Sequence, residues 1–163
     1  MAVDMFINMG ANIKGETQDD AQKAKNDIDV VSWSWGMTQT GVGHTGGGGG
    51  AGKVNVQDIS ITKYVDTATP ALQLHCATGK HIPKCVILVR KAGGTQQKYV
   101  EITLEDCLVT SVSTGASGGE ERLHEQVSIN FVKVAFEYFV QGKDGNTKSA
   151  GAFKYDVAAS KQL

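Results

Sequence analysis

The segment GGGGGAGKV, residues 46–54, contains the spacing G-x-x-x-x-G-K of a phosphate-binding P-loop, through Gly47, Gly52 and Lys53. A P-loop also needs a Ser or Thr after the lysine to hold magnesium, and a helix whose N-terminus faces the phosphates. Val54 occupies the hydroxyl position, and the residues that follow alternate as in a strand. The sequence therefore predicts a glycine-rich loop between two strands and no nucleotide site.

The dinucleotide-binding spacing G-x-G-x-x-G occurs a few residues earlier, at Gly41, Gly43 and Gly46. That fingerprint requires a helix after its third glycine, so that the pyrophosphate meets the helix N-terminus. Here the third glycine opens a run of glycines, which favours a connection between strands. We therefore expect a glycine-rich loop from about Gly41 to Gly52.

Metal binding and nucleophilic catalysis are no better supported. The histidines have neither HExxH nor i,i+4 spacing, and the cysteines form no C-x-x-C pair. The cysteines lie among apolar residues, which favours buried free thiols over metal ligands. The sequence has no G-x-S-x-G elbow, and no Ser, His and Asp stand out as a triad. We expect a non-enzymatic protein without catalytic residues, metal ligands or cofactors. The residues considered are His44, His75, His81, His124, Cys76, Cys85 and Cys107.

The length and charge of the chain limit its class. A chain of 163 residues suits one domain, which we expect to cover 1–163. A net charge of −1 gives no basic field for nucleic acid. The longest apolar runs, such as CVILV, are too short to span a bilayer. The N-terminus lacks a basic region, and Asp4 interrupts its apolar stretch, so we expect synthesis in the cytoplasm and any export to be independent of a signal peptide.

The dominant pattern is alternation with a period of two. The stretch IDVVSWSWGMTQTG predicts one strand with two different faces. One face is apolar and carries Val31, Trp33, Trp35 and Met37, and we expect it to face the core. The opposite face is small and polar and includes Ser32, Ser34 and Thr38.

Two further strands change parity along their length. Val54 and Val56 lie on one parity and Ile59 and Ile61 on the other, which indicates a bulge or a change of neighbour. HEQVSINFVKVAFEYFV changes parity near Phe131. Apolar residues left outside the core by such changes are candidate subunit contacts.

One helix is predicted, in TPALQLHCATG, with Thr69 as its cap, Pro70 in its first turn and Gly79 closing it in a left-handed conformation. Many strands with one helix predict an antiparallel sandwich or barrel. In the last strand, AFKYDVA, we expect Phe153, Tyr155 and Val157 to face inward.

Several segments together resemble the haemolysin-coregulated proteins (Hcp), the inner-tube subunits of the type VI secretion system. They are MAVDMFI, SWSWGM, GGGGGAGKVNVQDISITKY, ATGKHIPKCVILVRKAGG, VTSVSTGASGGEERLHEQVSINF and FKYDV. The similarity covers essentially the whole chain, and residues 16–27 and the tail after Val157 fit it least. It implies a mainly β fold, in which two antiparallel sheets form a small β-barrel with one α-helix beside it and an extended loop.

The resemblance also implies an assembly and its partners. Six copies form a ring, and rings stack into a tube inside a contractile sheath, tipped by a VgrG spike and expelled from the cell. Some members carry effector proteins in the ring lumen, and the family needs no cofactor for this role. A small-ligand-binding β-barrel is the alternative function, and it would show a closed apolar pocket in a monomer.

Two groups of residues are candidate contact sites. The resemblance implies that the extended loop protrudes toward the adjacent ring, and this loop includes Gly41, Gly43, His44, Gly46, Gly50, Gly52 and Lys53. The other group is Ser32, Ser34 and Thr38, which strand alternation turns away from the core. We expect these residues to line the lumen and contact effectors. The alternative is that they face the sheath.

Overall fold

The structure is a computed structural model that describes residues 3–41, 51–92 and 96–163. Within them the chain is mainly β, with two antiparallel sheets and the single helix α1 (Thr69–Thr78), as the sequence predicts. The strands are β1 (Val3–Asn8), β2 (Ile28–Asp29), β3 (Ser32–Ser34), β4 (Met37–Gly41), β5 (Ala51–Val56), β6 (Ile59–Tyr64), β7 (Ile82–Lys91), β8 (Gln97–Gly115), β9 (His124–Asn130), β10 (Lys133–Gln141), β11 (Thr147–Asp156) and β12 (Lys161–Gln162).

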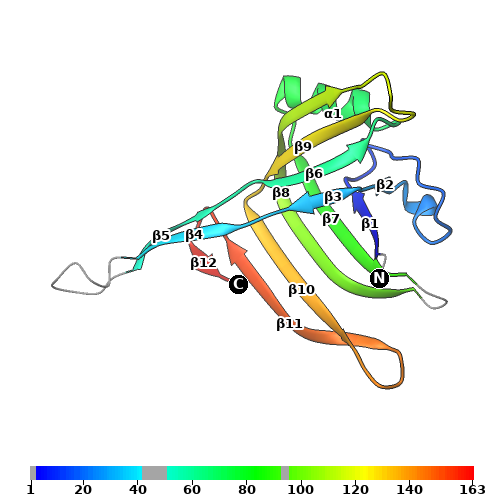
Figure 1. Cartoon of the computed structure of the whole chain (residues 1–163). Coiled ribbons are helices and arrows are strands. Elements are labelled where there is room, and N and C mark those ends of the chain that lie inside the picture. Colours follow the sequence, from blue (N-terminus) through cyan, green and yellow to red (C-terminus); the bar gives the residue numbers. More distant parts are fainter. Residues whose placement is uncertain (1–2, 42–50, 93–95) are drawn as a thin grey trace.

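The long strand β8 joins the two halves of the larger sheet (Figure 1). Its first half pairs with β7 on one side and β10 on the other, and its second half pairs with β9. From β7 the sheet continues to β1 and β2, and from β9 it continues to β6 and β3. Asp106, in a left-handed conformation with φ 52°, lies where β8 passes between the halves.

The strand ladders do not form a continuous closed barrel. Instead, the chain from 28 to 34 passes from the edge of β1 to the edge of β6. Between β2 and β3, Val30 N donates to Met5 O at 2.9 Å, and Val31 N donates to Thr62 O at 2.8 Å. The predicted second strand is therefore three shorter strands, because its residues change partners along the way.

The interior between the halves is filled with apolar side chains. The parity change at Gln57 places Ile59 and Ile61 in this core at 0% exposure. Val54 and Val56 are only half-buried, and Val56 packs against the edge of the core. The change near Phe131 has a different result. Val127, Ile129, Phe131 and Val134 all enter the same core, because the chain turns between β9 and β10.

Helix α1 packs against β8 and buries Leu72 and His75. Pro70 lies in its first turn, and Gly79 ends it at φ 68° in the predicted left-handed conformation. The predicted cap at Thr69 is wrong, because Thr69 is already helical. Asp66 Oδ1 instead accepts a hydrogen bond from Ala68 N at 2.9 Å, and the Thr69 hydroxyl donates to Glu125.

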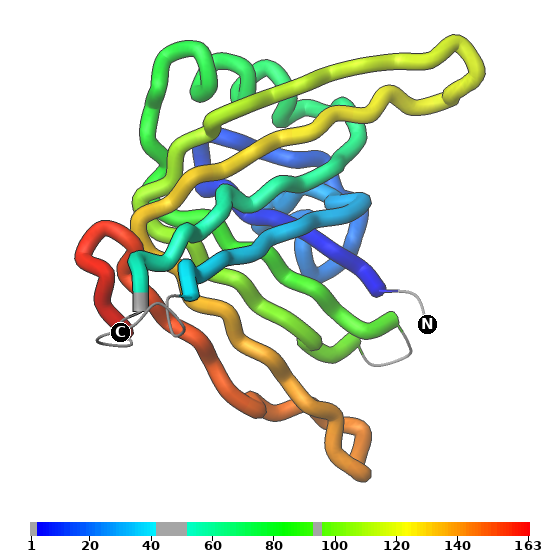
Figure 2. The backbone as a smooth tube through the Cα atoms, turned by 60° about the vertical axis from the view of Figure 1, so that its left-hand side comes forward, coloured from blue at the N-terminus to red at the C-terminus, as the bar shows by residue number. Residues whose placement is uncertain are grey.

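Strands β4 and β5 form the second sheet, a hairpin that projects from the body (Figure 1). We call this hairpin the arm. Figure 2 shows that it begins where β3 and β6 leave the larger sheet. At this point Trp35 Nε1 donates to Gln57 O at 3.0 Å, which holds the two strands of the arm together at its base.

The polar sequence of residues 16–27 predicts a loop or a short exposed turn of helix, and the structure has a 3-10 turn at Lys23–Lys25. The segment as a whole is less exposed than this, because it folds back onto β1 and β7. Asp19 forms an ion pair with Arg90 at 2.7 Å, and the Arg90 guanidinium lies 4.8 Å from the centre of the Phe6 ring. Asp27 accepts a hydrogen bond from Asn8 Nδ2 at 2.7 Å. The segment is thus held by buried polar contacts that hydrophobic periodicity does not reveal.

Candidate functional site

The second half of the larger sheet has an outer surface of small polar side chains, which we call the hydroxyl face. Backbone register aligns Ser34 with Ser60 across β3 and β6, and Ser60 with Ser128 across β6 and β9. A second row runs through Ser32, Thr62 and Gln126. The eight residues of the face are Ser32, Ser34, Ser60, Thr62, Ser111, Ser113, Gln126 and Ser128.

The other side of these strands faces the core. Ile61 and Val127 are paired neighbours with 0% exposure, and Trp33 pairs with Ile61 and packs against the same cluster. The face predicted from Ser32 and Ser34 is therefore confirmed as the side opposite the core, and it extends over four strands. None of its eight side chains carries a charge at neutral pH. The hydroxyl face can therefore form hydrogen bonds with a passing molecule but no ion pairs.

Thr38 does not belong to this sheet. It lies on the arm, where it pairs with Asn55 and is exposed. The break at Trp35 and Gly36 separates it from Ser34. The expectation that Val31 and Met37 face the core is wrong, because both are 39% exposed and Met37 lies on the arm. The sequence placed all three residues on one strand face, because alternation alone does not show where a strand leaves its sheet.

Gly41, Gly52 and Lys53 of the predicted loop lie on the arm and are exposed. Lys53 lies within β5, so a strand and not a helix surrounds it, as predicted. Gly43, His44, Gly46 and Gly50 lie outside the described residues.

An apolar surface, which we call the apolar flank, lies where β10 and β11 extend past the packed core. On β10, Tyr138 and Val140 continue the core-facing side beyond the buried Val134, with exposures of 41% and 38%. The predicted inward position of Phe153 is wrong in part. Its side chain is 38% exposed, but its ring lies 6.4 Å from that of Trp35.

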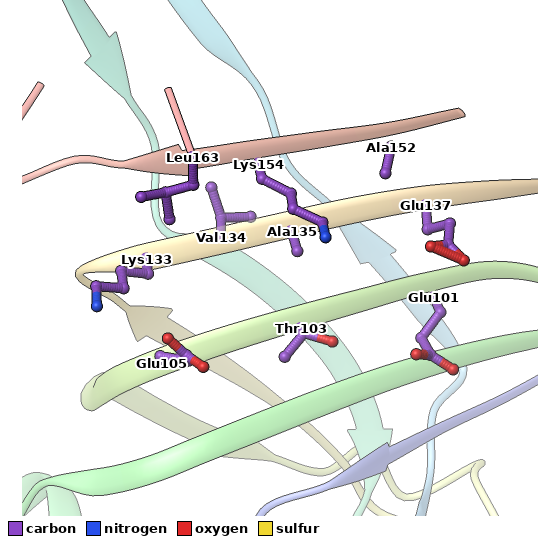
Figure 3. A pocket seen from close by; sticks show the side chains of 10 residues that line it. All are labelled: Glu101, Thr103, Glu105, Lys133, Val134, Ala135, Glu137, Ala152, Lys154 and Leu163. Atoms are coloured by element: carbon purple, nitrogen blue, oxygen red, sulfur yellow. The ribbon is translucent and has the colours of Figure 1, made fainter. Parts of the chain in front are cut away.

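The opposite side of this half-sheet is charged (Figure 3). Lys133 lies opposite Glu105, and Glu137 opposite Glu101, across β10 and β8. Glu101 also pairs with Lys98 at 2.8 Å. These side chains surround a shallow hollow of ≈ 330 Å³. The apolar flank and this charged side are therefore the two faces of one strand pair.

Behind the hydroxyl face lies a buried charged cluster that the sequence analysis missed. Lys63 is 0% exposed, and its Nζ donates to Glu125 Oε1, to Asp66 Oδ1 at 2.9 Å and to Tyr64 O at 2.8 Å. The Thr69 hydroxyl donates to Glu125 Oε1 at 2.8 Å. The cluster thus joins β6, β9 and the start of α1. The core-facing parity of Lys63 and Glu125 was the one available signal.

Metal and thiol chemistry gain no support in the described ranges. Residues 3–41, 51–92 and 96–163 contain no cluster of three or more His, Cys, Asp and Glu that could hold a metal. Cys85 and Cys107 are free and buried as predicted, whereas Cys76 is free but only half-buried. The pKa of Cys85 is raised, first by its contact with Cys107 and then by burial, so its thiol stays protonated and unreactive. No helix in these ranges is long and apolar enough to cross a membrane.

Comparison with known proteins agrees with this architecture. The family "Type VI secretion system effector, Hcp" matches residues 6–138. Protein hcp1 of Pseudomonas aeruginosa is 58% identical over 156 residues, which cover 95% of this chain and 94% of that protein. The crystal structure of Hcp1 from Salmonella typhimurium is 34% identical, with full coverage of both chains and a TM-score of 0.79. The crystal structure of a type VI secretion system effector from Yersinia pestis is 30% identical, with a TM-score of 0.73 and coverage of 94% of this chain and all of that one.

The fold and its surfaces define a mainly β protein that presents a polar sheet face, an apolar flank and a projecting arm. The chain belongs to the Hcp family of type VI secretion proteins.

Proposed function

We propose that this chain is a structural, non-enzymatic subunit of the type VI secretion inner tube. One observation carries the proposal: a four-stranded sheet has a packed core on one side and an uncharged hydroxyl face on the other. Around a ring axis, such sheets would form a hydrated channel wall that binds a passing protein only weakly. Family membership supports the same role.

The proposed ring is a homohexamer with the apolar flank as a subunit contact. Exposed Tyr138, Val140 and Phe153 on adjoining strands form a patch that a monomer would leave in water. Closed rings use head-to-tail contacts, in which this flank would meet a different surface of the neighbour. Native mass measurement with electron microscopy tests the proposal, since it predicts rings of six 17.3 kDa chains. A monomer at micromolar concentration contradicts it.

In the proposed tube, the hydroxyl face with Ser32 and Ser34 lines the lumen and contacts effector proteins in transit. Thr38, on the arm, would lie at the end of this surface. The arm, with Gly41, Gly52 and Lys53, would reach the adjacent ring. The wider partners we propose are the stacked rings, the sheath, the VgrG spike and the effectors. The chain would leave the cell through the type VI system, without a cofactor or nucleic acid.

A small-ligand-binding barrel is the weaker candidate. Ile87, Ile102, Leu104 and Ile129 fill the interior at 0% exposure, where such a protein would keep a pocket. The hollow described above lies on the outer surface, on the charged side of β8 and β10.

A further inference from the structure

A polar hollow of ≈ 420 Å³ lies beside the last turn of α1. Its walls come from the loop after β1, from the connection that follows α1, and from the start of β7. We call it the histidine hollow, because His75 and His81 both line it. It shares no lining residue with the hydroxyl face or the apolar flank. Its chemistry is therefore separate from the surfaces described above.

The histidine hollow has a positive balance of charge. Besides the two histidines, Lys84 and Asn12 line it, and none of its described lining residues is an Asp or a Glu. A hollow with a lysine and without a carboxylate favours an anion over a cation.

His75 brings a free acceptor to this hollow. The residue is 4% exposed, and its Nδ1 lies 2.7 Å from Ala71 O. A carbonyl oxygen only accepts, so Nδ1 carries the proton, and Nε2 of the neutral ring is an acceptor. Among the described residues, Arg90 Nε is the one fully enclosed side-chain N or O atom without a hydrogen-bond partner. Because Nε2 of His75 has no partner in the same ranges either, it is not enclosed, and a ligand in the hollow can reach it.

Three exposed side chains supply donors around this acceptor. Lys84 offers an ammonium group, Asn12 an amide NH₂ and His81 a ring N–H. Because all three are exposed, their side chains can turn toward a bound molecule. The hollow therefore combines one fixed acceptor with several adjustable donors, one of which is cationic.

Asn8 holds the loop after β1 in place. Its Oδ1 accepts from Gly10 N at 3.1 Å, and its Nδ2 donates to Lys25 O at 3.0 Å and to Asp27 Oδ1 at 2.7 Å. Gly10 adopts φ 85°, a left-handed conformation that glycine reaches without strain. This wall of the hollow is thus preformed. The amide of Asn8 is used on protein groups, which leaves Asn12 as the amide of this loop for a ligand.

One acceptor and several donors match an oxyanion that carries both charged oxygens and a hydroxyl. Hydrogen phosphate has this combination near neutral pH. Sulfate has a similar shape and charge but no hydroxyl, so one of its oxygens would meet the Nε2 lone pair without a proton between them. A phosphate monoester has the same disadvantage once the pH is well above its second pKa of about 6.

We propose that the histidine hollow binds inorganic hydrogen phosphate. The hydroxyl of the ligand donates to His75 Nε2, and its charged oxygens accept from Lys84 and from the donors of His81 and Asn12. This site goes beyond the proposed tube function and does not depend on ring formation, since every group belongs to one chain. A divalent metal suits the hollow less. Lys84 would repel it, and the described ranges hold no cluster of three His, Cys, Asp or Glu ligands.

Matched anions test the site in the full chain. In isothermal titration calorimetry at about pH 8 and constant ionic strength, inorganic phosphate should bind about 10-fold or more tightly than sulfate or methyl phosphate. The reason is that only hydrogen phosphate has a proton to donate to His75 Nε2. Equal affinities for phosphate and sulfate would show that Nε2 is not the acceptor, and the inference would be wrong.

Two variants separate the acceptor from the cation. Lys84→Met should weaken phosphate and sulfate by the same factor, about 10-fold, because both anions meet the ammonium group. His75→Phe keeps a ring and removes Nε2, so it should abolish the preference for phosphate over sulfate. Lys143→Met, at an exposed lysine in the turn between β10 and β11, is the matched control and should change neither affinity. A preference that survives in His75→Phe contradicts the proposal.

Nitrogen NMR of the histidine rings tests the contact without a substitution, and it decides the question if His75→Phe does not fold. Phosphate should shift the Nε2 signal of His75 and leave the ring of His124 unchanged. No shift at millimolar phosphate overturns the proposal. A shift with Zn²⁺ and none with phosphate would make the hollow a metal site and would overturn it too. Because these readouts need no ring or tube, failure of the tube function would leave them unaffected.

Discussion

At the scale of single residues, the buried cluster around Lys63 should dominate stability. Lys63→Met removes one cation and leaves Glu125 and Asp66 as two buried carboxylates without a counter-charge. Removing one partner of a buried pair costs about 3–5 kcal/mol of unfolding free energy. Glu125→Gln should cost less, because Lys63 keeps Asp66 at 2.9 Å. Denaturant unfolding at one fixed protein concentration measures both. Lys80→Met, at an exposed lysine, is the control, and equal effects of Lys63→Met and Lys80→Met would contradict the prediction.

Two carboxyls in residues 16–27 should give this segment opposite responses to pH. Hydrogen bonds from Arg90 hold the pKa of Asp19 below its ordinary value of 3.8, so its stabilising effect is present above that value and is lost as the pH falls through the lowered pKa. Burial raises the pKa of Asp27, so its ionised form destabilises the segment at neutral pH and this cost disappears as it becomes protonated.

Hydrogen exchange of residues 16–27, corrected for the intrinsic effect of pH, should show protection that rises as the pH falls from neutral and then drops below 3.8. Asp27→Asn should abolish the rise and keep the drop, since its amide oxygen can still accept from Asn8. Protection that only decreases on acidification in the unaltered protein would show that Asp27 does not behave in this way.

The sequence pattern predicted the direction of residues that follow the rule of apolar side chains inward and polar side chains outward. It missed the polar residues that point inward. Ser32 and Ser34 alternate with tryptophans, so their outward direction followed directly. Lys63 and Glu125 occupy core-facing positions. Their ion pair across β6 and β9 offsets the desolvation cost of burying both charges, and the two residues are 62 positions apart in the sequence. Long-range partners of this kind cannot be read from one chain.

At the scale of elements, the left-handed end of α1 should carry a measurable free energy. Gly79→Ala places a Cβ at φ 68°, where a non-glycine residue costs about 1 kcal/mol, although nothing lies within 4 Å of that Cβ. Gly118→Ala is the matched control, because the same open space surrounds it and its φ is not positive. Thermal unfolding at fixed concentration should separate the two variants, and equal midpoints would contradict the assignment of strain to Gly79.

The sequence predicted whether a segment is a strand or a helix better than it predicted where each strand begins and ends. The alternation of 28–41 indicated a strand but not its division among β2, β3 and β4, because neighbours and not residue type decide where a ladder stops. The parity change at Gln57 did mark the boundary between the arm and the core strand. At the start of α1, Thr69 resembles a cap in sequence, but Glu125 takes its hydroxyl and Asp66 accepts from the helix backbone.

At the scale of the whole molecule, the apolar flank should control ring formation. Val140→Glu places a carboxylate in a surface that we propose to be buried between subunits, and such a charge without a partner opposes association. Native mass should shift from ring to monomer. Leu74→Glu is the control, because Leu74 is more exposed, at 59%, and lies on α1, away from the flank. Monomers from both variants, or from neither, would contradict this role.

The hydroxyl face makes the second prediction at this scale. Ser34→Glu sets one carboxylate on the edge strand β3 of an uncharged surface, and the ring repeats it in every subunit. If this face lines the lumen, the six carboxylates face a common axis and change the field that a passing effector meets, while the core behind Ile61 and Val127 is untouched. The ring should therefore assemble, and effector co-purification should fall or shift toward basic cargo. Ser34→Thr keeps the hydroxyl and is the control. Intact effector binding with impaired sheath assembly would place the face outside the tube.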